Sequence, residues 1–381
     1  MNELEKQKVL FVINTSHILG GAEKQAIILA EGFKEKGLIV QFLSFTEGKL
    51  IRSILEKKGI SLIEFPFDFN SGKVHKLIAF IKLIRLIRYQ KIDVIIPYVA
   101  ESNLIIGAIW KYTGAKFVFW NQREEGRGLF GNNKEKRRLK NVSAIVSNSY
   151  EGKDFLCSKF NLSEEDVHVI NNGVILPEEV RSKGHFRSKY CLSEKDIIIS
   201  MIANISPRKD HKTLIEAWSI VIENYTGKDK LKLILGGRLD VRQTEILKLL
   251  SFDLGVCESI IFTGFLENPN ILIEESLFCV FSSRLEGCPN GILEAMAMKK
   301  AVISTDISGA RQAIGNEFEK ITFSNPDSPE DLAQKILNLL NNNDLRYKIE
   351  RTNYERIKSE FSTDQLINNY LSLFNQRFIQ S

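Results

Sequence analysis

The 381-residue sequence is short of the features that mark secreted and membrane-spanning proteins. No apolar run approaches the roughly 18 residues needed to cross a bilayer. Residues 1–16 lack a signal-peptide pattern. The cysteines show no spacing typical of disulfide pairs or metal sites, and they are Cys157, Cys191, Cys257, Cys279 and Cys288. We therefore expect a cytoplasmic protein in a reducing compartment.

Disorder is also excluded, because 44% of the residues are hydrophobic and 26% are charged. The length favours two domains over a single large one. A G-x-G-x-x-G fingerprint is missing after the first expected strand, so an NAD-dependent enzyme is a disfavoured alternative.

The net charge of +5 is unevenly distributed. Residues 1–185 carry 28 Lys and Arg against 21 Asp and Glu, a net charge of +7, whereas the remainder carries 24 against 26. Within the basic half, Val74–Lys91 mixes apolar and basic residues at helical spacing, and Lys134–Lys140 adds five positive charges and one negative. These segments favour an anionic membrane surface as a partner, with an ordinary packed helix and its solvated face as an equal alternative. We expect no nucleic-acid partner, because no aromatic-interleaved basic motif accompanies the charge.

Short apolar runs alternate with amphipathic helical stretches along the chain, and this pattern is typical of parallel sheets covered on both faces. The first set of expected strands is Val9–Thr15, Ile39–Phe45, Leu62–Phe65, Asp93–Tyr98, Lys116–Trp120, Ala144–Ser149 and Val167–Ile170. The second set is Ile197–Ala203, Leu231–Leu235, Ser259–Thr263, Leu277–Ser283 and Ala301–Thr305. The sequence thus predicts an α/β protein with two tandem Rossmann-like, doubly wound domains.

A polar stretch, Asn171–Lys189, separates the two sets of strands and has the composition of a linker. We expect an N-terminal domain over residues 1–180 and a C-terminal domain over residues 190–360. Residues 361–381 are expected to form a helix that packs back on the first domain. Ligands of such sheets bind at the carboxyl ends of the strands, and a cleft between the domains is the expected site.

The segment 282–306, SSRLEGCPNGILEAMAMKKAVISTD, carries two carboxylates around a glycine-rich turn. Pro289 ends the preceding strand and Asn290 is an expected N-cap of the helix Ile292–Met298, with Glu294 in its first turn. The free N–H groups of such a helix start suit a diphosphate. Glu294 could accept two ribose hydroxyls and Glu286 could face a sugar ring. A plain strand-loop-helix unit with a capping carboxylate is the alternative.

Two further candidate loops follow the first expected strand of each domain. Arg208 and Lys209 stand together before a helix, where they could neutralise a diphosphate leaving group, although a solvated pair in a turn is the commoner fate. Gly20 and Gly21 allow a ligand to approach the backbone closely, although packing alone could also require them. His211 and His17 are further candidates, each of which could equally be a structural hydrogen-bonding residue.

The motif Glu286-x7-Glu294, with Gly287, Pro289, Asn290 and the following LEAMA, resembles the donor site of family 4 glycosyltransferases. These are retaining enzymes of the GT-B fold, in which two Rossmann-like domains face each other across a cleft. Thr305-Asp306 and Gly309 continue the family's pattern, whereas Lys299 and Ala301 stand where the family usually has Gly and Pro.

The resemblance implies a role for most of these residues. Glu294 would bind the ribose and Glu286 would lie near the donor sugar, while Lys209 matches a basic residue of the family. Asn204 stands at the position of the family's Arg, and Arg208 would take the role of that Arg. The loop of Gly20 and Gly21 resembles the family's GGAE loop near the donor. The backbone contacts to donor and phosphates would come from Gly287, Cys288, Pro289, Asn290, Gly291, Ile292 and Leu293.

On the acceptor side this sequence departs from the family. The His that many members carry after the strand Lys116–Trp120 is missing, so His17, Asn121, Arg123 or Glu124 would line the acceptor. The N-terminal domain would bind this acceptor and the C-terminal domain the donor.

The resemblance predicts a hexose or N-acetylhexosamine transferase that uses a nucleotide diphosphate sugar, UDP being the expected nucleotide. Its acceptor would be a glycan or lipid-linked glycan in cell-surface polysaccharide, lipopolysaccharide or glycolipid synthesis, at the inner membrane face. Glu286, Lys209 and Arg208 would serve the reaction without an obligatory metal or other cofactor, and no Asp-x-Asp pair is present. A non-catalytic protein that binds nucleotide sugars on the same fold is the alternative.

Overall fold

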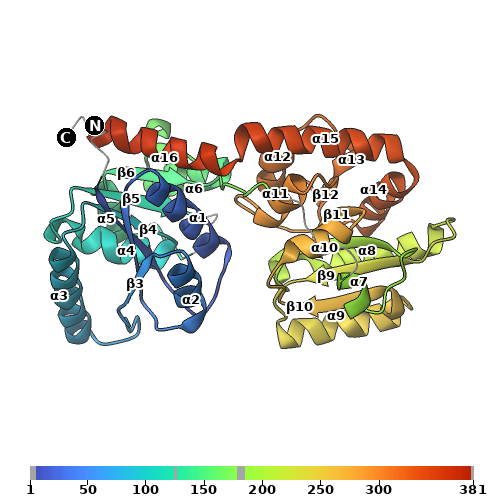
Figure 1. The fold of residues 1–381 in the computed structure, drawn as a ribbon, viewed down its shortest axis with the longest axis horizontal. Coiled ribbons are helices and arrows are strands. Elements are labelled where there is room, and N and C mark those ends of the chain that lie inside the picture. Colours follow the sequence, from blue (N-terminus) through green and yellow to red (C-terminus); the bar gives the residue numbers. More distant parts are fainter. Residues whose placement is uncertain (1–5, 124–125, 127, 178–184, 379–381) are drawn as a thin grey trace. The chain divides into compact units, whose positions relative to one another are not determined.

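The computed structural model describes residues 6–378 except 124, 125, 127 and 178–184. The chain forms two compact units (Figure 1). The first unit comprises Met1–Gly173 together with Thr363–Ser381, and the second comprises Val174–Ser362. The chain therefore passes from one unit to the other twice, at Gly173 and again at Ser362.

The first unit is built on a parallel seven-stranded sheet in the order β3-β2-β1-β4-β5-β6-β7. Its strands are β1 (Lys8–Ile13), β2 (Ile39–Ser44), β3 (Ser61–Glu64), β4 (Val94–Pro97), β5 (Phe117–Gln122), β6 (Ala144–Ser147) and β7 (Val167–Val169). Its helices are α1 (Gly21–Glu35), α2 (Lys49–Lys57), α3 (Lys73–Gln90), α4 (Ala100–Ile109), α5 (Asn133–Lys140), α6 (Tyr150–Phe160) and α16 (Thr363–Phe378). All seven strands expected from the apolar runs are confirmed.

Both faces of this sheet are buried, which explains why its strands are apolar at every position. Val9, Phe11 and Ile13 of β1 join a cluster with residues of α1, α2 and α16. Leu10 and Val12 of the same strand join a second cluster with residues of α3 and α4. Alternate side chains of a strand point to opposite faces, so helices on both sides require an unbroken apolar run.

Helix α16 is the last described helix, and it belongs to the first unit although it follows the whole of the second. Its side chains Leu366, Ile367, Tyr370, Leu373 and Phe374 are buried in the cluster that also holds α1. A Cβ atom on Gly32 of α1 would lie 2.0 Å from Cδ1 of Ile367. The absence of a side chain at Gly32 therefore lets the two helices approach closely.

The second unit repeats the architecture with a parallel six-stranded sheet in the order β10-β9-β8-β11-β12-β13. Its strands are β8 (Ile197–Ile202), β9 (Leu231–Gly236), β10 (Ile260–Gly264), β11 (Phe278–Phe281), β12 (Val302–Thr305) and β13 (Phe323–Ser324). Its helices are α7 (His185–Lys189), α8 (His211–Asn224), α9 (Val241–Asp253), α10 (Pro269–Glu275), α11 (Asn290–Ala297), α12 (Ser308–Ile314), α13 (Glu319–Thr322), α14 (Pro329–Asn341) and α15 (Asn343–Glu360). The two-residue edge strand β13 was not expected, because it is too short to form an apolar run.

The strand order confirms the two doubly wound domains and locates where each sheet can bind a ligand. In each sheet the order reverses beside the first strand of the unit, between β1 and β4 and between β8 and β11. The helices that follow neighbouring strands leave on opposite faces at such a point, so the loops above it separate and leave a crevice.

A buried polar network attaches α16 to this first sheet. Nη2 of Arg123 donates to the hydroxyl of Tyr370 at 2.6 Å, and Nη1 donates to Oδ1 of Asn172 at 3.0 Å. The Tyr370 hydroxyl in turn donates to Oδ1 of Asn121. Burial raises the pKa of Tyr370, so its hydroxyl keeps the proton that it donates.

Replacing this hydroxyl tests how much the network stabilises the first unit. Tyr370→Phe leaves buried polar atoms of Arg123 and Asn121 without one partner each, so we expect the free energy of unfolding to fall by about 1–3 kcal/mol. Urea unfolding measures the change. The control is Tyr347→Phe, whose side chain is 62% exposed and which should change stability by less than about 0.5 kcal/mol. Equal stability of the two variants would contradict this role.

Candidate functional site

Two loops of the second unit meet at the point where its strand order reverses. The loop after β8 carries Lys209 and the loop after β11 carries Glu286, and Nζ of Lys209 forms an ion pair with Oε1 of Glu286. The hydroxyl of Ser283 donates to the same Glu286 oxygen at 2.7 Å. The side chains of Lys209 and Glu286 are 28% and 14% exposed, so solvent reaches both charges. The structure thus brings together two residues that are 77 positions apart and were selected from separate motifs.

Main-chain and hydroxyl contacts hold these two loops together. The hydroxyl of Ser282 donates to the carbonyls of Lys209 at 3.2 Å and of Asp210 at 2.9 Å. The backbone N–H of Arg284 donates to the carbonyl of Arg208 at 2.8 Å. Arg208 lies in the 3-10 turn Pro207–Lys209 with its side chain half-buried. The positions of both basic residues are therefore fixed relative to the second loop.

Helix α11 begins directly after the second loop. Its N-cap is Pro289 in an extended conformation, so the helix starts at Asn290. The expected N-cap at Asn290 and first turn around Glu294 are corrected accordingly, and Glu294 is the fifth residue of the helix. Gly287, Cys288 and Pro289 are buried, and so are Ile292 and Leu293 of the helix, whereas the side chains of Glu294 and Asn290 are half-buried. Glu286 lies shortly before α11 in the sequence, so the backbone N–H groups of the first helical turn closely follow this carboxylate along the chain.

The structure explains why the family's pattern has a glycine at Gly309 of α12. A Cβ atom there would lie 2.2 Å from the carbonyl oxygen of Glu286 and 2.4 Å from that of Gly287. Because these neighbours are backbone atoms, they cannot move aside as a flexible side chain could. Helix α12 can therefore pack this closely against the loop only because residue 309 has no side chain.

Asn204 has a structural contact in the described structure. Its side chain is exposed, and Oδ1 accepts the backbone N–H of Arg238 at 3.0 Å. This bond joins the loop after β8 to the loop after β9. Asn204 thus holds the edge of the site, and no contact between its side chain and Lys209 is among those described.

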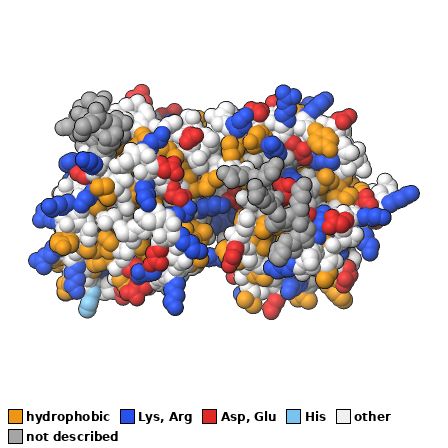
Figure 2. Space-filling view, viewed as in Figure 1, with side chains coloured by type: hydrophobic (Ala, Val, Ile, Leu, Met, Phe, Trp, Pro, Cys, Tyr) orange, Lys and Arg blue, Asp and Glu red, His pale blue; other side chains and the backbone are white. Residues whose placement is uncertain are grey.

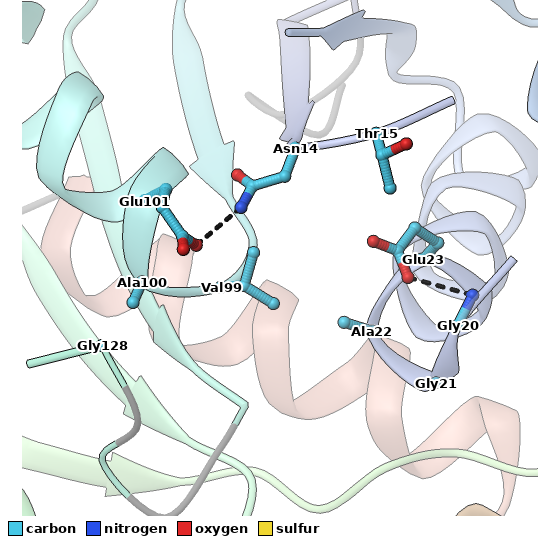
Figure 3. A pocket seen from close by; sticks show the side chains of 10 residues that line it. All are labelled: Asn14, Thr15, Gly20, Gly21, Ala22, Glu23, Val99, Ala100, Glu101 and Gly128. Carbon is cyan, nitrogen blue, oxygen red and sulfur yellow. Dashed lines mark hydrogen bonds between the residues drawn. The ribbon is translucent and has the colours of Figure 1, made fainter. Parts of the chain in front are cut away.

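The first unit has a pocket of about 490 Å³ at its own point of strand reversal. Figure 3 shows that Asn14 at the end of β1 and Glu101 at the start of α4 point toward each other, and Nδ2 of Asn14 donates to Oε2 of Glu101 at 2.6 Å. Oε2 of Glu23 accepts the backbone N–H of Gly20 at 3.1 Å. The lining consists of Asn14, Thr15, Gly20, Gly21, Ala22, Glu23, Val99, Ala100, Glu101 and Gly128.

Val99 introduces backbone strain at this pocket. Its φ of 66° and ψ of 167° are rare for a β-branched residue. Such strain costs on the order of 1–3 kcal/mol and persists where the surrounding structure imposes it, often at a binding site. Val99 joins the end of β4 to α4, so this conformation places Glu101 beside Asn14.

The sequence did not single out Asn14, Val99 or Glu101. Asn14 lies inside the expected strand Val9–Thr15, which ends at Ile13 in the structure, and Glu101 closely follows another expected strand. Only the strand order, which brings β1 and β4 together, makes them neighbours. A search for polar residues within the last positions of each expected strand and just after it could have found both.

The expected acceptor-side residues do not gather in this pocket. The side chains of Asn121 and Arg123 are buried in the network with Tyr370, and neither lines the pocket. His17 is exposed in the loop after β1 and is not among the lining residues. Glu124 lies outside the described residues. In the described structure, Asn121 and Arg123 position α16 and the sheet.

His211, at the start of α8, is buried beside the loop that carries Lys209. Burial, helped by the positive charge of Lys209 and opposed by the backbone of Ala203, lowers the pKa of His211 to about 4. The imidazole is therefore neutral at pH 7, and no proton transfer at neutral pH is assigned to it.

The described residues also bear on metals and membranes. Among them, no group of three or more His, Cys, Asp and Glu side chains lies close enough to hold a metal ion. None of the described helices has both the length and the apolar character required to span a bilayer.

Both halves of the chain match families of known proteins. Residues 19–176 match the family described as Glycosyltransferase Family 4, and residues 182–356 match Glycosyl transferases group 1. The chain belongs to glycosyltransferase family 4. This family 4 glycosyltransferase has the GT-B fold, with its two Rossmann-like units, as the sequence resemblance predicted.

Curated relatives are similar over part of their length. A Campylobacter jejuni protein named N-acetylgalactosamine-N,N'-diacetylbacillosaminyl-diphospho-undecaprenol 4-alpha-N-acetylgalactosaminyltransferase is 28% identical over 53% of this chain and 52% of its own. An Escherichia coli protein named UDP-Gal:alpha-D-GlcNAc-diphosphoundecaprenol alpha-1,3-galactosyltransferase is 22% identical over 72% of this chain and 75% of its own. The matches span between 40% and 59% of the first three curated relatives' own length.

Solved structures share the fold over nearly the whole chain. A glycosyltransferase from Rickettsia africae superposes with a TM-score of 0.84 at 23% identity, covering 99% of this chain and all of the other. Anabaena HepE, solved in complex with UDP and glucose, superposes with a TM-score of 0.82 at 16% identity, covering 97% of this chain and all of the other.

The buried His211 predicts a pH dependence of stability. Unfolding restores an ordinary histidine pKa near 6.5, so between about pH 6.5 and about pH 4 only the unfolded chain takes up this proton. Stability should fall as the pH falls through this window and level off below it. The total loss from this residue is on the order of 3 kcal/mol.

The variant His211→Asn should lose this component. We expect the free energy of unfolding of the wild type to decrease more steeply than that of the variant between about pH 6.5 and about pH 4. Urea unfolding at a series of pH values measures both slopes. His75→Asn, an exposed change in α3, is the control and should retain the wild-type slope. Parallel curves for the wild type and His211→Asn would rule out the effect.

Proposed function

We propose that this protein transfers a hexose or N-acetylhexosamine from a UDP-sugar to a glycan or lipid-linked glycan, with retention of anomeric configuration and without an obligatory metal. The observation that carries the proposal is the Lys209–Glu286 pair at the strand reversal of the second unit, directly before the start of α11. A carboxylate, an ammonium and the backbone N–H groups at the start of a helix, gathered at one loop cluster, suit a sugar joined to a diphosphate.

In the proposed reaction the bond between the anomeric carbon and the β-phosphate oxygen breaks. The bonding electrons leave with the diphosphate, so negative charge grows on that oxygen. A hydroxyl oxygen of the acceptor forms the new bond to the anomeric carbon, and the hydroxyl proton passes to the departing diphosphate. The ammonium of Lys209 and the guanidinium of Arg208 would stabilise this charge, together with the N–H groups of α11. These three sources of positive charge can replace a metal ion, because each interacts directly with phosphate oxygens.

The two carboxylates would bind hydroxyl groups of the donor. Glu286 would accept hydrogen bonds from the sugar ring once Lys209 turns to the diphosphate, and Glu294 would accept both ribose hydroxyls. The backbone of the loop between them would contact donor and phosphates. Ser283, which donates to Glu286, would hold that carboxylate in place.

The pocket of the first unit would bind sugar hydroxyls of donor or acceptor. Asn14 offers an amide donor and acceptor, and Glu101 offers carboxylate oxygens, which together match hydroxyl groups. Gly20 and Gly21 let a ligand approach the start of α1. His17 and Glu124 remain candidates for contact with the acceptor.

The nature of the acceptor is proposed from the relatives. Two of them are named for transfer to diphosphoundecaprenol-linked sugars, and a third, from Staphylococcus aureus, is named poly(ribitol-phosphate) alpha-N-acetylglucosaminyltransferase. A lipid-linked glycan in cell-surface polysaccharide or lipopolysaccharide synthesis is therefore the proposed acceptor class. The proposal includes a cytoplasmic protein whose N-terminal unit associates with an anionic membrane surface.

Two single substitutions test the donor site. Lys209→Ala removes a charge that stabilises the leaving group, so we expect kcat to fall by roughly 100- to 1,000-fold. Glu294→Ala removes a charged hydrogen-bond acceptor for the ribose, so we expect the donor KM to rise by roughly 10- to 100-fold. Release of the nucleoside diphosphate from UDP-, GDP- and ADP-sugars, supplied with lipid-linked glycans, measures both. Lys212→Ala and Glu245→Ala remove exposed charges in the same unit and serve as controls.

Wild-type kinetics in both variants would refute this donor site. The alternative, a protein that binds nucleotide sugars without catalysis, requires UDP binding with no UDP released for any acceptor supplied. The anomeric configuration of the first product, read by NMR, tests retention, and activity in EDTA tests metal independence.

A third variant separates the position of the loop from its charges. Gly309→Ala places a methyl group against the carbonyls of Glu286 and Gly287, so the loop must move. We expect turnover to fall by roughly 10- to 100-fold although every charged residue remains, because small displacements of a positioned group are costly. The control is Gly72→Ala, where the nearest atom is 4.0 Å away. Unchanged turnover in Gly309→Ala would show that this contact does not position the site.

A further inference from the structure

Helix α3 of the first unit has an exposed face that its own fold does not use. Leu83 and Ile87 are buried in the core beneath the helix. On the other face, four aliphatic side chains are between 42% and 69% exposed, and they are Val74, Leu77, Ile78 and Ile81. An exposed apolar face on a helix that already covers its core indicates a contact outside the unit.

The arrangement around the helix is as informative as the exposure. At 100° per residue the four aliphatic side chains fall within an arc of about 100°, and Arg85 and Arg88 fall within the same arc further along the helix. Lys82 and Tyr89 lie just beyond one edge of this arc, and the Tyr89 ring is 82% exposed. In Figure 2, hydrophobic and basic side chains gather over α3, at the lower left of the view.

The charge of this region is of one sign. Residues 69–92 contain no Asp or Glu and six Lys or Arg, which are Lys73, Lys76, Lys82, Arg85, Arg88 and Lys91. A partner must therefore offer negative charge and an apolar layer at once. The interface of an anionic lipid bilayer offers both, with phosphates above the acyl boundary.

We propose that α3 lies in the plane of an anionic lipid membrane, with Val74, Leu77, Ile78 and Ile81 inserted at the acyl boundary and Arg85 and Arg88 at the headgroups. Long basic side chains suit this depth, because their stems cover apolar surface while the charges reach the phosphates. A second copy of the chain fits the face poorly, because two α3 helices packed together would oppose five positive charges with five. This proposal rests on the proposed function, which includes membrane association of the N-terminal unit, and it names α3 as the element that makes the contact.

Vesicle co-sedimentation of the full chain tests the proposal. The vesicles are phosphatidylcholine with one-third phosphatidylglycerol, and phosphatidylcholine alone. We expect binding to the anionic vesicles that weakens with salt. Arg85→Gln with Arg88→Gln should weaken it by roughly tenfold or more. Leu77→Ser with Ile81→Ser should weaken the binding more at high salt than at low salt, because at high salt insertion of apolar side chains supplies most of the binding.

Matched controls lie in the second unit. Lys228→Gln with Lys230→Gln removes the same charge from exposed positions, and Leu249→Ser with Phe252→Ser removes apolar side chains of α9 that are 65% and 70% exposed. Both should bind vesicles as the wild type does. Equal binding of the wild type and the α3 variants would overturn the proposal. So would a dimer in solution that α3 variants dissociate while no vesicle binding is seen.

The test does not depend on turnover. If no UDP-sugar supports transfer but binding still requires α3, the membrane contact stands and the proposed activity fails. If transfer to a water-soluble glycan proceeds equally in all variants while vesicle binding does not require α3, the activity stands and the membrane contact fails.

Discussion

The reversal of strand order in each sheet is the constraint on which the candidate sites depend. Parallel strands need helical crossovers, and only where consecutive crossovers cover opposite faces do the loops above the strands separate. In the second unit this brings the loops after β8 and β11 together, and with them Lys209 and Glu286. In the first unit it brings Asn14 beside Glu101. Neither pair could form if the strands followed the order of the chain.

The return of the chain to its first unit is secured by a different kind of contact. Apolar packing of α16 would suffice for burial, yet the helix also places Tyr370 between Arg123 and Asn121. Burying a guanidinium is costly unless its N–H groups find partners, so the network specifies one position for the helix. Asn121 and Arg123, which were expected on the acceptor side, are instead buried in this network.

The sequence predicted the fold because two of its determinants, the apolar strands and the polar linker, can be recognised from short stretches of sequence. A strand buried on both faces must be apolar at each position, as Leu10, Phe11 and Val12 are, and a linker must be polar. The edge strand β13, with two residues, is too short for such an apolar pattern to predict it. At the sites, residue type found Lys209 and Glu286 and the family resemblance added Gly309, but neither found Glu101, whose partner depends on strand order. Burial of Asn121 and Arg123 could not be predicted, because it depends on a helix more than 240 positions away.

In the proposed donor complex, the Lys209–Glu286 pair would separate and each group would take a new partner. Without a ligand, a half-buried ammonium and carboxylate lower each other's electrostatic energy at a solvent-exposed loop. A diphosphate carries more negative charge than a carboxylate and offers more acceptor oxygens, so the ammonium gains by exchanging one for the other. The exchange would free Glu286 oxygens to accept hydrogen bonds from hydroxyl groups of the donor sugar. A nucleotide sugar would therefore give both groups a new partner, whereas a nucleoside diphosphate without the sugar would give one only to Lys209.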